Sequence, residues 1–194
     1  MRKDLAVTNI VYFDCFSGAA GDMLLGALLD AGYPLEELRS GLALLGVAGY
    51  DLALHRVQQH GITGSKFEVI DQAGERPVRN LALIREILGH ASLPESVAAQ
   101  SLEVFTRLAR AEARIHGVDI DQVHFHEVGA VDALVDIVGC CLALHGLGVE
   151  AVYASALPLG GGTIRTEHGL LPVPAPATLA LIAEVGAPTL PVEA

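Results

Sequence analysis

The stretch NIVYFDCFSGAAGDMLLGALLDAG (residues 9–32) joins a β-branched and aromatic run to an apolar helical pattern through a glycine-containing turn. The run NIVYFD has the composition of a short strand, and the leucines that follow Asp22 repeat at helical spacing. We therefore predict a strand over 9–14, a turn over 17–22 and a helix after it. A strand followed directly by a helix is typical of α/β proteins.

Helix-start and helix-end residues mark most of the remaining elements. Pro34 suits the first position of a helix, Asn80 suits a helix cap, and Gly117 follows a long amphipathic pattern. A β-hairpin with its turn around 59–65 and a run of strand-like residues over 152–176 complete the pattern. We expect helices over 35–46, 81–90, 95–116, 129–145 and 177–185 and the hairpin over 50–71.

These elements predict a mixed fold, α/β in class with α+β character, built from a strand, glycine turn and helix, a hairpin, long helices and a short mixed sheet. A chain of 194 residues that is 52% hydrophobic can form one substantial core. We predict a single domain over 1–194. The polar segment DQAGERPVRN (71–80) is the candidate internal boundary.

Composition excludes several classes of protein. No apolar run approaches the roughly 20 residues that span a bilayer, and no signal-peptide pattern follows the start, so we expect a cytoplasmic protein. Twelve basic and 23 acidic residues give a net charge of −11, which argues against a nucleic-acid partner. The three cysteines have no zinc-ligand spacing, and we expect reduced, mostly buried thiols.

The segment DQVHFHEVGAVDALVD (121–136) concentrates imidazoles and carboxylates within an apolar chain. In an extended HFH segment the two histidines point to one side and the phenylalanine to the other, and two aspartates four apart share one helical face. These side chains form the predicted divalent-metal site: His124, His126, Glu127, Asp132 and Asp136. The alternative is an ordinary polar strand edge and helix start.

A second group of residues suits a phosphate. The SGAAGD turn (17–22) leads into a helix N-terminus, where free amides and the helix dipole favour an anion, and the GGG turn (160–162) can bring main-chain amides close to a ligand. The alternative is a tight strand-to-helix turn at 17–22, with Asp22 capping the helix, and a β-bulge or hairpin turn at 160–162. The predicted substrate or phosphate contacts are Asp14, Ser17, Gly18, Gly21, Asp22, Gly160, Gly161, Gly162 and His168. The sequence assigns no catalytic residue.

Three blocks together resemble the LarC family, the nickel insertion proteins of nickel-pincer cofactor biosynthesis. They are DCFSGAAGDM (14–23), VHFHEVGAVD (123–132) and HGLLPVPAPAT (168–178). The resemblance implies a lyase-type nickel insertase that, with CTP and Mg or Mn, places nickel in pyridinium-3,5-bisthiocarboxylic acid mononucleotide, forming the cofactor of lactate racemase.

The chain departs from the family in two ways. Its 71–80 segment contains no histidine, whereas many family members carry a histidine-rich insertion there, and the family's CTP-handling C-terminal half is absent. The resemblance therefore implies an N-terminal, metal- and substrate-binding half whose partners are a C-terminal half or subunit and apo lactate racemase. We also expect a homo-oligomer. A non-catalytic nickel carrier and a structural assembly module are the alternative functions.

Overall fold

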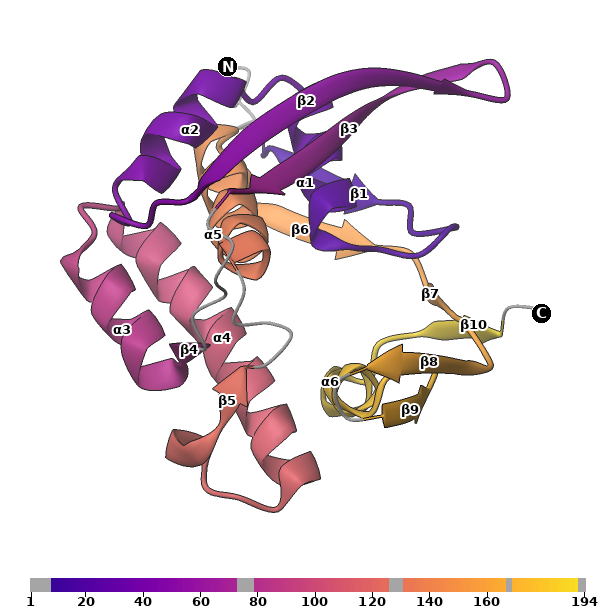
Figure 1. The fold of residues 1–194 in the computed structure, drawn as a ribbon. Coiled ribbons are helices and arrows are strands. Elements are labelled where there is room, and N and C mark those ends of the chain that lie inside the picture. Colours follow the sequence, from indigo (N-terminus) through magenta and orange to yellow (C-terminus); the bar gives the residue numbers. More distant parts are fainter. Residues whose placement is uncertain (1–7, 73–78, 126–130, 167–168, 192–194) are drawn as a thin grey trace, which may run out of the picture.

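The computed structural model describes residues 8–72, 79–125, 131–166 and 169–191 (Figure 1). The first half contains β1 (Ile10–Phe13), α1 (Gly21–Asp30), α2 (Leu35–Ala43), β2 (Tyr50–Gln59), β3 (Ile62–Asp71), β4 (Arg79–Asn80) and α3 (Leu81–His90). The second half contains α4 (Glu95–His116), the 3-10 helix η1 (Ile120–Gln122), β5 (His124–Phe125), α5 (Val131–Gly146), β6 (Ala151–Ala154), β7 (Leu157–Leu159), β8 (Thr163–Thr166), β9 (Gly169–Pro172), α6 (Pro176–Val185) and β10 (Thr189–Pro191).

The predicted mixed fold class is confirmed, and the strands pair two by two within the described residues. Strands β1 and β6 pair in parallel, as do β7 and β10, whereas β2–β3, β4–β5 and β8–β9 are antiparallel. Helices pack against these strand pairs, and α5 contacts α1, α2 and α4. The helices therefore form the centre of the fold, and the short sheets surround them.

The core lies where α1 and α2 pack on α5. Leu25 and Leu38 are fully buried, and both approach Gly139 of α5, where their side-chain carbons lie 3.1–3.2 Å from the position that a Cβ would take. Leu134 and Val138, at helical spacing on α5, are also fully buried. A glycine at this crossing lets the three helices approach closely.

The predicted hairpin is confirmed, with its turn reduced to two residues. Gln59 pairs with Ile62, and both intervening residues have positive φ, 50° at His60 and 83° at Gly61. Two left-handed residues suit the right-handed twist of a hairpin. Phe67 points into the core, and the outer end of the hairpin projects beyond the helices (Figure 1).

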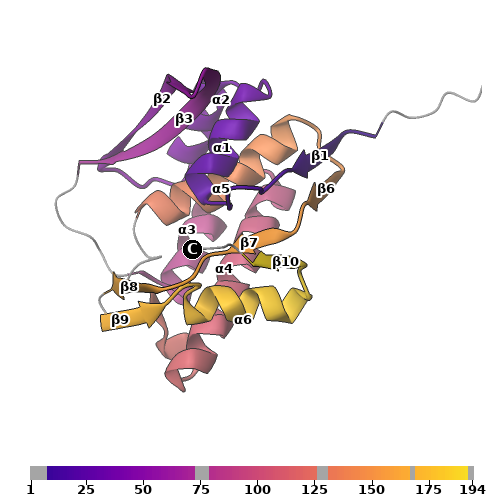
Figure 2. The same cartoon turned by 90° about the vertical axis from the view of Figure 1, so that its right-hand side faces the viewer.

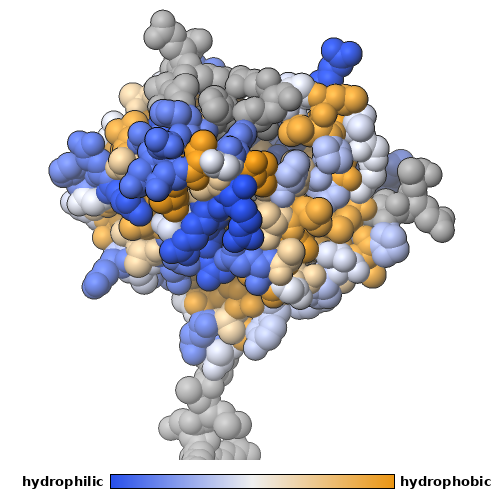
Figure 3. All heavy atoms as spheres, turned by 90° about the horizontal axis from the view of Figure 1, so that it is seen from below, coloured by the Kyte–Doolittle hydropathy of each residue, from blue (hydrophilic) through white to orange (hydrophobic). Residues whose placement is uncertain are grey.

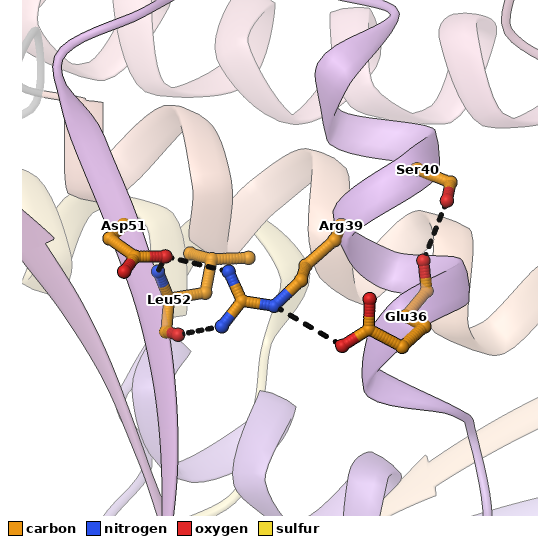
Figure 4. Close-up of polar contacts among 5 residues, drawn as sticks. All are labelled: Glu36, Arg39, Ser40, Asp51 and Leu52. Carbon is orange, nitrogen blue, oxygen red and sulfur yellow. Dashed lines mark hydrogen bonds and ion pairs between the residues drawn. The ribbon is translucent and has the colours of Figure 1, made fainter.

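Arg39 of α2 attaches the base of the hairpin to the helices (Figure 4). Its Nη1 lies 2.6 Å from Asp51 Oδ1, its Nη2 donates to the carbonyl of Leu52, and its Nε lies 3.6 Å from Glu36 Oε1. The guanidinium lowers the pKa of the Asp51 carboxyl, first through the hydrogen bond. One planar side chain thus satisfies groups on both elements.

Two of the predicted helix ends are confirmed, and two differ from the structure. The side chain of Asn80 accepts a hydrogen bond from Leu83 N at 2.9 Å, and Gly117 ends α4 in the left-handed conformation, as expected. Pro34 is the residue before α2 instead of its first residue. Asp22 does not cap α1: the cap position is Ala20, and Asp22 lies in the first turn.

The segment from β6 to β10 packs differently from the rest of the chain. Among the described residues, every buried side chain lies between Cys15 and Ala143, and α6 contributes none. Figure 2 shows α6 with β7 to β10 as a group beside α4, and in Figure 3 hydrophobic side chains gather on the right-hand half of the face, where Figure 1 places α6. Leu179 and Val185 of α6 are 49% and 59% exposed.

We predict that this difference in packing determines the cost of truncating side chains. Phe105 of α4 is fully buried and its ring centroid lies 6.2 Å from that of Phe125, so Phe105→Ala should lower the free energy of unfolding by about 3–5 kcal/mol. The matched control Leu179→Ala should cost under about 1 kcal/mol. Urea denaturation followed by circular dichroism measures both, and equal losses would contradict the proposed position of the core.

Candidate functional site

A pocket of about 590 Å³ lies between the N-terminal turns of α1 and α5 and the strand β3. Its polar lining residues come from three elements that are far apart in the sequence. They are Asp22 of α1, Lys66 and Glu68 of β3, and Asp132 and Asp136 of α5. Four carboxylates and one ammonium group therefore face the same space.

Asp22 and Asp132 occupy equivalent positions, each in the first turn of its helix. Asp22 Oδ1 accepts from Met23 N at 2.9 Å, and Asp132 Oδ1 accepts from Ala133 N at 2.8 Å. Both side chains are exposed, and a carboxylate in a first helical turn is stabilised by the helix dipole.

Asp136 lies deeper, against the start of α1. Its Oδ2 is 2.3 Å from the position that a Cβ at Gly21 would take, so a larger residue than glycine does not fit there. Its Oδ1 is buried without a hydrogen-bond partner in the described part of the structure. Burial, followed by the negative charges of Asp22 and Asp132, raises the pKa of Asp136 from 3.8 to about 7.

Lys66 is the cationic side chain among the described residues that line the pocket. Its Nζ lies 2.5 Å from Glu68 Oε1, and His55 Nε2 lies 3.4 Å from Glu68 Oε2. The hydrogen bond to Glu68 raises the pKa of Lys66, and the same bond lowers the pKa of Glu68. A further cation, Arg79 of β4, is 6% exposed; burial lowers its pKa, and the charge of Asp132 opposes that effect.

Part of the predicted metal site falls in this pocket. Asp132 and Asp136 line it, whereas His124 lies on β5, exposed, with its neighbour Phe125 buried as the alternation of a strand requires. His126 and Glu127 lie outside the described residues. Within the described ranges, no three His, Cys, Asp or Glu side chains form a group that could hold a metal ion.

The predicted phosphate contacts are divided among different places. Asp14, Ser17 and Gly18 lie in the connection from β1 to α1, where Gly18 has φ +96° and its N–H donates to Cys15 O at 2.9 Å. Gly160 to Gly162 connect β7 to β8. Of this predicted set, Asp22 is the residue found among the described pocket-lining side chains, and His168 lies outside the described residues.

The cysteines are free thiols, as expected. Cys15 and Cys141 are buried, and burial raises the pKa of Cys140 to about 12, with the charge of Asp136 adding to the effect. A thiol with this pKa is protonated at neutral pH, and metal ions bind the thiolate form. No cysteine is among the described residues that line the pocket, and their polar side chains carry oxygen and nitrogen groups.

The family model described as nickel insertion protein matches residues 11–194. The chain belongs to the nickel insertion protein family. The "Putative nickel insertion protein" of Roseiflexus castenholzii is 52% identical over 185 residues, which cover 95% of this chain and 47% of that protein. The pyridinium-3,5-bisthiocarboxylic acid mononucleotide nickel insertion protein of Desulfitobacterium hafniense is 52% identical over 174 residues, 90% of this chain and 43% of that protein.

This nickel insertion family member thus spans less than half the length of these relatives. No solved structure matches it. Among its described helices, none combines the length and the apolar character needed to cross a membrane.

Lys66 and Glu68 were not among the predicted site residues. Both lie in a hairpin strand that the alternation of apolar and polar residues predicts. This alternation does not show which helix termini the strand will face. One signal was present: the sequence contains two lysines, Lys3 and Lys66, so a lysine within this strand is unusual for this chain.

We predict that Asp136 makes the stability of the chain depend on pH. Because its pKa is about 7 in the folded chain and near 3.8 in the unfolded chain, the folded state holds the extra proton between these values. The stabilisation is complete below about pH 4 and is lost as the pH rises through 7. Asp136→Asn does not titrate, so its stability relative to the wild type should rise over this range.

We expect a relative gain of about 1–2 kcal/mol, since part of the carboxyl reaches solvent. Urea denaturation at pH 4.5, 6 and 8 with a chelator present measures it. The control is Asp121→Asn, because Asp121 is exposed and is not among the described residues that line the pocket. A constant difference between Asp136→Asn and the wild type across this range would show that the carboxyl titrates normally.

Proposed function

We propose that this chain supplies a metal- and substrate-binding part in the insertion of nickel into pyridinium-3,5-bisthiocarboxylic acid mononucleotide. The observation that carries the proposal is the shared pocket of Asp22, Asp132 and Asp136 in a nickel insertion family member. The substrate is the compound for which the Desulfitobacterium hafniense relative is named.

Nickel is the cargo of this reaction. Carboxylates and imidazoles are harder ligands for divalent nickel than thiolates are. An ion held by them can therefore pass to a ligand with sulfur donors. The thiocarboxylate groups of the mononucleotide are such donors. We propose that Asp132 and Asp136, with His124, His126 and Glu127, hold the ion before this transfer, and that the turn at 17–22 offers main-chain donors to the substrate.

The remaining features of the proposal come from the LarC resemblance. We propose that the reaction is a lyase-type metallation that depends on CTP and on Mg or Mn, and that the product serves lactate racemase. Because the chain spans less than half the length of its relatives, we propose that the CTP-handling part belongs to the remainder of the longer proteins.

The first test measures nickel affinity. Asp132→Asn with Asp136→Asn, and separately His124→Ala with His126→Ala, should each weaken nickel binding at least about tenfold by isothermal titration calorimetry, because each pair removes two ligands. Glu103→Gln with Glu112→Gln removes two carboxylates from α4, outside the pocket, and should leave the affinity within about twofold of the wild type. Wild-type affinity in both folded ligand-pair variants would overturn the metal site.

The second test measures cofactor formation as activation of apo lactate racemase. This chain alone should give no activation, and activity should appear when the remaining part of a longer relative is supplied with CTP and Mg or Mn. Full CTP-dependent activation by this chain alone would refute the division of labour. Nickel binding without any affinity for the mononucleotide would instead support a nickel carrier.

A further inference from the structure

Lys66 is placed where an anionic ligand of the acidic pocket needs a cation. The sequence has two lysines, and Lys3 lies outside the described residues. Among the described side chains that line the pocket, Lys66 is the cationic one, and it faces a space shared with Asp22, Glu68, Asp132 and Asp136. Four carboxylates repel an anion, so a ligand with a phosphate requires a compensating charge.

The ammonium group of Lys66 is accessible for such a contact. Its side chain is 55% exposed, and it makes an ion pair with Glu68, whose side chain is 38% exposed. An ion pair in contact with solvent contributes little to stability, so a stronger anionic partner can replace it. A lysine ammonium has three donors, and a phosphate can accept from those that Glu68 leaves unused.

The depth of the polar groups gives the pocket two different ends. Asp136 lies against Gly21 with one oxygen buried, whereas the side chains of Lys66 and Glu68 on β3 are partly exposed to solvent. A ligand that brings sulfur donors and nickel to the aspartates therefore keeps its other end near β3. In the mononucleotide that other end carries the phosphate.

We propose that Lys66 binds the phosphate group of the mononucleotide and thereby orients its metal-binding end toward the aspartates. This inference rests on the proposed function, since it takes the mononucleotide as the ligand. It assigns to β3 a substrate contact that is separate from the main-chain donors of the turn at 17–22.

The test compares the mononucleotide with its dephosphorylated riboside by isothermal titration calorimetry, using the wild type and Lys66→Gln. Removing the phosphate contact should lower the affinity of Lys66→Gln for the mononucleotide at least about tenfold and leave its affinity for the riboside unchanged. Lys66→Arg keeps the charge and should remain within about threefold of the wild type. Nickel affinity should not fall in either variant.

Arg56→Gln is the matched control. Arg56 lies on the same hairpin, pairs with Asp30 at 2.6 Å and is not among the described residues that line the pocket. Its substitution changes the net charge by the same amount, so it should leave the affinity for the mononucleotide within about twofold. An equal loss in Arg56→Gln would attribute the effect to overall charge and overturn the assignment of Lys66.

Two failures are distinguishable. A wild-type chain that binds the mononucleotide while folded Lys66→Gln binds it equally well overturns the role of Lys66 and leaves the proposed function standing. A wild-type chain with no affinity for the mononucleotide overturns both. A loss of riboside and mononucleotide affinity by the same factor in Lys66→Gln would show that the lysine shapes the pocket without contacting the phosphate.

Discussion

The carboxylate of Asp136 occupies the space that a side chain at Gly21 would fill, and this contact sets the distance between α1 and α5 at their N-terminal ends. The glycine is required there because the two helices start side by side with an acid between them. Deeper along the same helices, Gly139 allows Leu25 and Leu38 to pack closely on α5. Two close approaches, one polar and one apolar, therefore fix α5 against the first helices of the chain.

The polar contact is costly for folding and useful for chemistry. Burying a carboxyl beside two other acids disfavours its charged form, which is why the pKa of Asp136 rises to about 7. A cation that enters the pocket reverses this cost, because it attracts the same three carboxylates that repel one another. In the proposed function, this attraction holds nickel until the sulfur donors of the substrate compete for it.

The buried side chains are unevenly distributed along the described part of the chain. The buried side chains lie between Cys15 and Ala143 among the described residues, whereas α6 and the strands around it keep apolar side chains such as Val185 and Leu190 in contact with solvent. Parallel strand pairs usually have both faces covered, yet Tyr12 of β1 is 61% exposed and Tyr153 of β6 is 57% exposed. The relative from Roseiflexus castenholzii is about twice as long as this chain, which carries these exposed surfaces.

The sequence by itself determined the local elements. Asn80 and Gly117 act through neighbouring backbone groups, and the strand, turn and helix at 9–32 follow from composition and period, so each could be predicted within its own segment. The hairpin turn was predicted around 59–65, and the structure narrowed it to residues 60–61. Each of the three motif blocks is also one continuous segment, and together they indicated the family. Only the tertiary structure decided that Asp22, predicted as a phosphate contact, shares a pocket with Asp132 and Asp136, predicted as metal ligands. It also brought Lys66 there and paired the strands two by two. These outcomes depend on the packing of α1, α5 and β3 against one another, which joins residues more than forty positions apart, and no local preference of the chain specifies such contacts.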